Sequence, residues 1–253
     1  MSQAMRRGLF WLVFVAAGLS LVAHLTSHQQ LRLEFVGGLE MTSSSRDFGG
    51  FSSFRFLKPG SDFIGVSDNG LWFFGSVERG PEGKPEGFGH FRMEQMFDRS
   101  GKRSGSKWEV DAKGLAVKDG IATVGFERDH RVSQFRIAPD AMEPAFRELD
   151  FLIPKRELRQ NRSFETVAYS HPYGQHEGGL VVVTEKSLDR HGNVFSAIIE
   201  GPNKGIFTVK RHGEFDITDG AFLPNGDLLL LERSFSMLSG VKMRLRRIYG
   251  ESI

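Results

Sequence analysis

The sequence predicts an all-β protein, and within that class a β-propeller of repeated antiparallel blades. Short apolar segments alternate with turns rich in Gly, Pro, Asn and Asp, which is typical of strands joined as hairpins. Four such hairpins each end in an acidic residue: Asp68, Glu127, Glu185 and Glu232, separated by 59, 58 and 47 residues. A repeat near 50 residues with several strands per unit indicates propeller blades.

The return strands of these hairpins support the same fold class. They are nearly unbroken apolar runs, which suits strands covered on both faces by neighbouring blades. A β-sandwich is the competing interpretation, but its strands would alternate more cleanly between apolar and polar residues, and no whole unit would repeat.

In chain order, residues 31–35 alternate and predict a first strand at an edge or in a closing position. The hairpins are predicted at 49–70, 111–131, 161–186 and 219–233, with a long loop at 170–179 inside the third. Turn sequences such as Lys118-Asp119-Gly120 and Pro224-Asn225-Gly226-Asp227 mark their reversals. Further strands are predicted at 71–77, 91–97, 132–137, 194–200, 206–210 and 242–249, and residues 143–149 fit a short helix or an irregular connection.

The composition excludes several classes of function. The net charge is +2, and removal of a leader with Arg6 and Arg7 would leave a neutral body, which argues against nucleic acid as a partner. The chain has no Cys, so disulfides, thiolate catalysis and zinc–thiolate sites are excluded. The 253 residues suffice for one large domain, predicted at 31–253.

The first 27 residues predict a signal peptide or a membrane anchor. Arg6 and Arg7 precede an apolar run at 8–25, the pattern of a secretory signal. The run is long for a signal and at the lower limit for a helix that spans a bilayer. Either alternative places the body outside the cytoplasm, in the periplasm or secreted, with inner-membrane attachment through 8–25 if the run is kept.

Symmetry about each turn predicts which side chains meet at the open ends of the hairpins. Opposed residues on paired strands have Cβ atoms about 5 Å apart, and all four open ends would lie on one rim of the propeller. The predicted pairs are Glu165 with Glu185, Asp219 with Glu232, Lys113 with Glu127, and Asp68 with Ser52.

Two interpretations of this acidic rim are open. Opposed like charges are destabilising, and an excess of carboxylate oxygens suits Ca²⁺. A calcium site would use Glu165, Glu185, Asp219, Glu232 and Asp68. The alternative is a structural one, in which arginines of neighbouring blades form ion pairs with the acids.

Three residues are candidates for acid–base catalysis. Glu165 and Glu127 belong to the predicted rim, and His130 follows Glu127 closely at the end of a strand. No Gly-x-Ser-x-Gly motif, phosphate-binding loop or dinucleotide fingerprint accompanies them.

Several segments, taken together and in order, resemble the family called esterase-like activity of phytase. They lie at 67–73, 111–116, 126–131, 161–168, 223–227 and 231–235. The resemblance implies a phytase-like propeller that hydrolyses a phosphate or carboxylic ester of a small molecule with Ca²⁺. A non-catalytic binding or scaffold module is the alternative function.

The chain departs from the family pattern at two places. The family has Glu where this chain has Lys113, so a Lys113–Glu127 ion pair would replace part of a metal site. Family members also continue beyond the last matching strand, so the resemblance implies a propeller that is short at its C-terminus, with its ring either left open or closed by fewer blades.

Overall fold

The computed structural model describes residues 34–103, 106–138 and 140–253, and the chain divides into units 1–37 and 38–253. The predicted leader 1–27, with its apolar helix at 8–25, lies outside the described residues. Of the strand predicted at 31–35, only Glu34 and Phe35 are described. Neither belongs to a strand, because no other segment pairs with them, and Phe35 is exposed. This part of the prediction is wrong. In the part of the chain that the structure describes, no helix is long and apolar enough to cross a membrane.

The described residues of the larger unit form four antiparallel sheets, each a meander of consecutive strands. Blade 1 contains β1 (Phe51–Phe56), β2 (Asp62–Ser67), β3 (Leu71–Arg79) and β4 (Pro85–Gln95). Blade 2 contains β5 (Ala112–Lys118), β6 (Ile121–Phe126), β7 (Arg131–Arg136) and β8 (Arg147–Leu149). Blade 3 contains β9 (Phe164–Tyr169), β10 (Leu180–Leu188), β11 (Val194–Glu200) and β12 (Gly205–Val209). Blade 4 contains β13 (Asp216–Phe222), β14 (Leu228–Ser236) and β15 (Gly240–Ile248).

Helices are short and few in this fold. The described ones are α2 (Lys107–Val110), just before blade 2, and the 3-10 turns η1 (Lys155–Glu157) and η2 (Gly250–Ser252). The stretch 143–149, predicted as a short helix or an irregular connection, instead ends in strand β8, which pairs with β7. Strand β4 begins at Pro85, earlier than the predicted position 91, because it pairs along most of β3.

All four predicted hairpins are confirmed, and each forms the inner pair of strands of one blade. The turn residues explain why. Asp119 and Gly120 have φ values of 50° and 73°, and Gly226 has φ of 89°. Gly, Asn and Asp tolerate this left-handed region, so they permit the tight reversals that set strand pairing.

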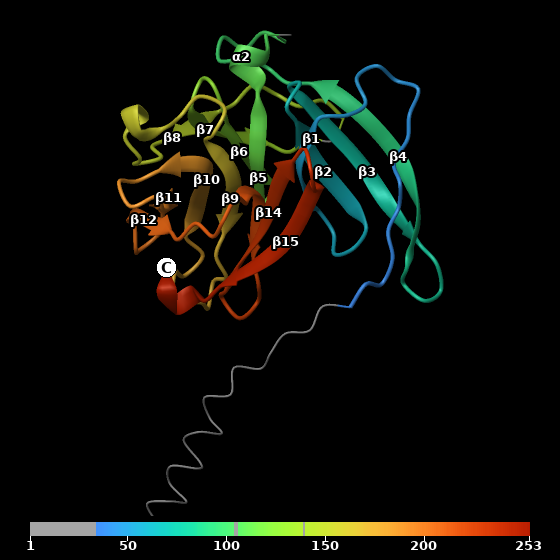
Figure 1. Ribbon diagram of the computed structural model, residues 1–253. Helices are drawn as coiled ribbons and strands as arrows, with labels where there is room; N and C mark the ends of the chain where they lie inside the picture. Colours follow the sequence, from blue (N-terminus) through green and yellow to red (C-terminus); the bar gives the residue numbers. More distant parts are fainter. Residues whose placement is uncertain (1–33, 104–105, 139) are drawn as a thin grey trace, which may run out of the picture. The chain divides into compact units, whose positions relative to one another are not determined.

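The sheets are arranged as propeller blades, as the sequence predicts (Figure 1). The first strands of the blades, β1, β5, β9 and β13, adjoin one another in that order around the centre. Separate apolar cores fill the spaces between blades 1 and 2, blades 2 and 3, and blades 3 and 4. Trp72 with Phe126, Phe164 with Leu180, and Val181 with Leu230 are representative members of these three cores.

Blades 4 and 1 meet through polar contacts between their first strands. Arg55 donates to both carboxylate oxygens of Asp219, at 2.8 and 2.7 Å, and Ser53 donates to the same carboxylate at 3.0 Å. Between these two blades the described residues form no buried apolar core comparable to the other three. The contact that connects the last blade to the first therefore depends largely on one bidentate ion pair.

Candidate functional site

Three glutamates from two adjacent blades converge at one end of the propeller. Glu127 directly follows β6, Glu165 lies in β9, and Glu185 lies in β10. One carboxylate oxygen of each lies within 4.8 Å of the others. The pairing of β9 with β10 shifts register between Val183 and Thr184, so this convergence includes an irregularity that turn symmetry does not predict.

Burial and mutual repulsion act on all three carboxyl groups. Glu127 and Glu185 are 3% and 7% exposed. Burial raises the pKa of Glu127 and of Glu185. Burial also raises the pKa of Glu165 well above its usual range, and Glu127, Glu185 and Asp219 add to this effect. The cluster therefore favours a proton or a cation over three free negative charges.

Two basic side chains offset part of this charge. The Lys113 ammonium lies 3.3 Å from Asp111 and 3.8 Å from Glu127. Burial alone would lower the pKa of Lys113, but Glu165, Asp111 and Glu127 together raise it. Arg162 donates to Glu185 at 2.8 Å.

Backbone and neighbouring ion pairs hold these side chains in place. The Ser163 amide donates to Glu127 at 3.0 Å. Asp111 is 1% exposed and accepts a 2.8 Å hydrogen bond from Arg128. Because Asp111 binds both Arg128 and Lys113, it fixes the lysine beside the three glutamates.

The three glutamates line open cavities at the same rim. A cavity of about 290 Å³ is lined by Asp68, Lys113, Glu165, Glu185 and Arg233, among others. A second, of about 270 Å³, contains Glu127 and Arg128 and shares Lys113, Glu165, Glu185 and Arg233 with the first. In both, carboxylates and basic side chains face the same space.

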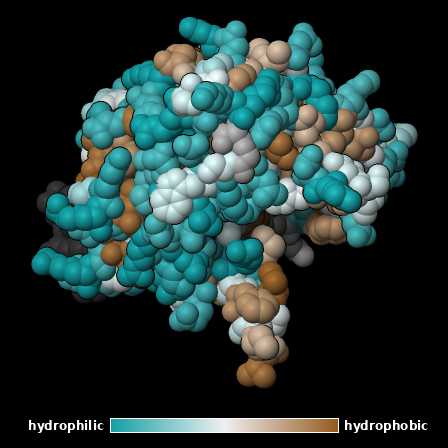
Figure 2. All heavy atoms as spheres, turned by 90° about the horizontal axis from the view of Figure 1, so that it is seen from above, coloured by the Kyte–Doolittle hydropathy of each residue, from teal (hydrophilic) through white to brown (hydrophobic). Residues whose placement is uncertain are grey.

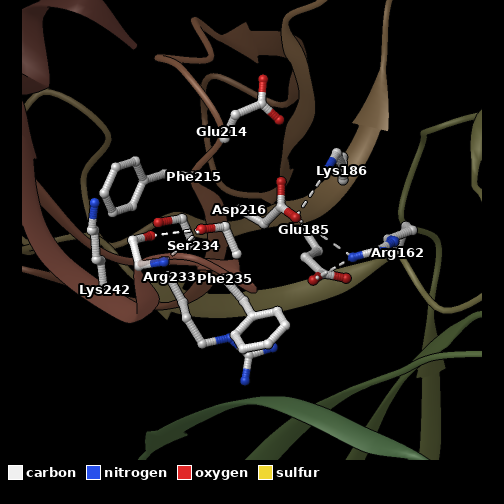
Figure 3. A pocket seen from close by; sticks show the side chains of 12 residues that line it. Arg162, Glu185, Lys186, Glu214, Phe215, Asp216, Arg233, Ser234, Phe235 and Lys242 are labelled. Atoms are coloured by element: carbon white, nitrogen blue, oxygen red, sulfur yellow. Dashed lines mark hydrogen bonds and ion pairs between the residues drawn. The ribbon is translucent and has the colours of Figure 1, made fainter.

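A larger cavity of about 760 Å³ adjoins these two through shared residues and extends between blades 3 and 4. Figure 3 shows Arg162 and Glu185 joined on one side of it, with Phe235 and Arg233 projecting from the end of β14. Aromatic side chains, serines and Lys242 line its remaining walls. The charged rim is therefore continuous with a roomier, partly aromatic pocket.

The predicted pair Asp219–Glu232 does not form. Asp219 lies opposite Leu231, because the strands pair symmetrically about Asn225 rather than about the point between Asn225 and Gly226. A register shift between Ile217 and Asp219 then places Glu232 opposite Ile217. Asp219 binds Arg55, as described above. Glu232 is 1% exposed and accepts hydrogen bonds from Arg244 and Arg246. The predicted pairing is wrong, and both acids are already neutralised by arginines.

The other residues predicted to meet at the rim do lie near one another. Glu165 meets Glu185 within the cluster, and Lys113 contacts Glu127 at 3.8 Å. Asp68 and Ser52 line the same cavity, where Asp68 binds Lys107 at 2.8 Å.

His130 lies beside the glutamate cavities rather than in them. Its Nδ1 is 3.1 Å from the Ser163 hydroxyl, and it lines neither glutamate cavity. Burial lowers the pKa of His130. A catalytic role for this histidine stays a prediction.

Sequence reasoning missed three contributors to the site: Asp111, Arg162 and Lys107. Turn symmetry had no means to find them, because Lys107 and Arg162 precede the paired strands. The available signal is their position, since Asp111 and Arg162 lie at the starts of the predicted hairpins 111–131 and 161–186, and Lys107 lies four residues before the first of these.

The geometry of the three glutamates fits a calcium ion. Oxygen ligands lie 2.3–2.6 Å from Ca²⁺, so two ligands of one ion are at most about 5 Å apart. The oxygens of Glu127, Glu165 and Glu185 satisfy this limit. When Glu127, Glu165 and Glu185 are all ionised, Lys113 and Arg162 offset two of the three negative charges. One negative charge then remains, which favours binding of a cation.

Comparisons with known proteins bear on the fold and the family. No curated protein matches the chain. Among solved structures, the β-propeller domain of Cps50 (Swd1) from Myceliophteria thermophila matches at 10% identity and a TM-score of 0.38, over 78% of this chain and 54% of that one. A putative 6-phosphogluconolactonase from Bacteroides uniformis matches at 15% identity and a TM-score of 0.39, over 78% and 56%. The chain thus covers little more than half the length of each of these two solved structures.

The family comparison covers most of the chain. The pattern described as "Phytase-like: Esterase-like activity of phytase" matches residues 46–252, which include all four blades and every residue of the rim described above. The protein belongs to this phytase-like family.

Proposed function

We propose that this protein is an exported hydrolase of phosphate or carboxylic esters that holds Ca²⁺ on Glu127, Glu165 and Glu185. The observation that supports the proposal is the convergence of three carboxylate oxygens within 4.8 Å of one another in open cavities. Membership of the phytase-like family supports the class of reaction. Export rests on the predicted leader at 1–27.

The basic residues around the carboxylates have a direct role in this proposal. Bound Ca²⁺ would polarise the ester oxygen and lower the pKa of a coordinated water. Arg233 lines both glutamate cavities and is exposed, and among the described residues it has no ion-pair partner. Arg233 and Lys113 would bind the anionic oxygens of the substrate and stabilise the charge that develops in the transition state.

Glu165 has the properties of a group that exchanges a proton with the site. Its pKa is raised well above the usual range by burial, and it lines the cavity. It would lose its proton when the cation binds. Asp68 lines the same cavity and forms an ion pair with Lys107, so it would add a further carboxylate to the site.

A non-catalytic binding or scaffold role is the second candidate, and one observation favours it. Lys113 and Arg162 already offset two negative charges, and a proton on Glu165 would neutralise the third. The cluster would then act as a structural contact between blades 2 and 3 and would need no metal.

Calorimetric titration of the purified protein with Ca²⁺ separates the two candidates. If the protein is a hydrolase, the wild type binds Ca²⁺, and Glu165→Gln binds it at least about tenfold more weakly because one ligand charge is lost. The same variant should also lose turnover of p-nitrophenyl phosphate or p-nitrophenyl acetate. Glu82→Gln is the matched control, since among the residues that the structure describes Glu82 forms an ion pair only with Lys84, at the surface. Absence of Ca²⁺ binding, or equal turnover in Glu165→Gln and wild type, would reject the hydrolase in favour of the structural role.

A further inference from the structure

The turn between β14 and β15, with the adjoining ends of both strands, presents an unusual concentration of exposed apolar side chains. Leu238 is 102% exposed, Met237 93% and Phe235 67%, followed by Val241 at 61% and Met243 at 59%. Large contiguous apolar surfaces are uncommon on monomeric proteins and usually mark an interaction site. We call residues 233–243 the apolar hairpin.

The apolar hairpin has a defined conformation. The hydroxyls of Ser236 and Ser239 are 2.7 Å apart, and the Ser239 amide donates to Ser236 at 3.0 Å. Gly240 adopts φ of 65°, which permits the tight reversal. The turn therefore holds Met237 and Leu238 outward as a projecting tip.

Basic residues flank this tip. Arg233 and Lys242 are exposed, and neither has an ion-pair partner among the described residues. The acids that share the 760 Å³ cavity with them are Glu185, Glu214 and Asp216. Each of these already has a basic partner, because Glu185 binds Arg162, Asp216 binds Lys186 and Arg211, and Glu214 lies 3.8 Å from Arg211.

One more exposed apolar side chain, from another element, lies at the same rim. Trp108, in α2, is 48% exposed, and its neighbour Lys107 lines one of the glutamate cavities. Arg233, at the base of the apolar hairpin, lines the same cavity as Lys107. Figure 1 shows α2 at the top of the molecule and the β14–β15 turn lower down. Seen from above in Figure 2, the molecule is mostly hydrophilic with separate hydrophobic areas, one of them a narrow projection at the lower edge.

We infer that the apolar hairpin docks this rim of the propeller onto an anionic lipid bilayer. A convex tip of Met and Leu between unpaired basic residues matches the boundary between charged headgroups and acyl chains. Trp prefers the same depth in a bilayer. Phe235 and Lys242 line the 760 Å³ cavity, so docking places its mouth next to the membrane surface. The inference goes beyond the proposed hydrolase and does not depend on it.

The chain allows a clean test because it contains no Cys. Leu238→Cys in the full chain carries an environment-sensitive fluorophore at the tip. Tyr173→Cys is the matched control, since Tyr173 is 94% exposed in the β9–β10 connection, at the opposite end of the strands that carry Glu165 and Glu185. An N-terminal anchor would bring both labels to a vesicle, but only docking through the hairpin would insert the label at 238.

With vesicles of phosphatidylglycerol and phosphatidylcholine, the label at 238 is expected to shift to the blue and the label at 173 to stay unchanged. Pure phosphatidylcholine should give a much weaker shift at 238. Adding Lys242→Glu to the Leu238→Cys protein should weaken vesicle binding at least about fivefold, since one basic residue near an anionic surface contributes that much.

Three results would overturn the inference. One is no response at 238, and another is an equal response at 238 and 173. The third is a blue shift at 238 that appears without vesicles and rises with protein concentration, because it would identify a second copy of the chain as the occupant of the hairpin.

Discussion

Replacement of Lys113 by Met removes the basic side chain at the centre of the acidic rim. In the wild type its ammonium lies 3.3 Å from Asp111 and 3.8 Å from Glu127, and its side chain is 18% exposed. Removing one partner from a buried charge cluster costs about 3–5 kcal/mol. Asp111 keeps Arg128 and Glu127 keeps the Ser163 amide. Because these partners remain, we expect a loss at or below the lower limit of that range, about 2–3 kcal/mol of unfolding free energy at pH 8.

The loss should depend on pH in a defined direction. Burial raises the pKa of Glu127 and Glu165, so their ionisation destabilises the fold as the pH rises from the unfolded-state pKa through the folded-state pKa. Lys113 limits that destabilisation, and its own raised pKa keeps it charged throughout this range. Lys113→Met should therefore lose stability more steeply than wild type on going from about pH 5 to pH 8, and the two should be closest at the acidic end.

Urea denaturation followed by tryptophan fluorescence measures this effect, because Trp72 is fully buried. Lys84→Met is the control: Lys84 forms an exposed pair with Glu82, which contributes at most about 1 kcal/mol. Ca²⁺ should restore more stability to Lys113→Met than to wild type, since the cation replaces the missing charge. An identical loss at pH 5 and pH 8, with no response to Ca²⁺, would show that Lys113 acts through packing alone.

Two further substitutions test the surroundings of the site. Glu232→Gln leaves Arg244 and Arg246 without their buried carboxylate partner. Urea denaturation should show a loss of about 3–5 kcal/mol of unfolding free energy, while the Ca²⁺ affinity measured by calorimetry stays unchanged. A weakened Ca²⁺ affinity would instead place Glu232 in the metal site. Gly114→Ala adds a Cβ that would lie 2.9 Å from the Val167 amide nitrogen and 3.0 Å from the Glu165 carbonyl oxygen, so β5 must move away from β9. We expect a loss of about 1–3 kcal/mol together with weaker Ca²⁺ binding, and unchanged stability would contradict the close packing of these strands.

The fold could be predicted because its signals are local. Asp119-Gly120 and Asn225-Gly226 specify reversals by backbone conformation alone, and the repeated hairpins then imply blades. The short strand β8 was missed because its three residues carry no alternation and form a strand only by pairing with β7.

The site was predictable only as far as turn symmetry holds. The hairpin of blade 4 pairs about Asn225, so Asp219 faces Leu231 instead of Glu232, and an extra residue of β13 between Ile217 and Asp219 then sets Glu232 opposite Ile217. A shift of one residue reverses the face of every side chain beyond it. Glu165, Glu185 and Glu127 converge nevertheless, because the inner strands of blades 2 and 3 pack directly against each other.

Glu127, Glu165 and Glu185 are proposed to hold one Ca²⁺ ion together. A crystal structure of the protein grown with Ca²⁺ tests it most directly. We expect an ion about 2.3–2.6 Å from a carboxylate oxygen of each of the three glutamates, with the Lys113 ammonium displaced from its position 3.8 Å from Glu127. An ion bound elsewhere, with the three carboxylates still joined only through Lys113 and Arg162, would contradict it.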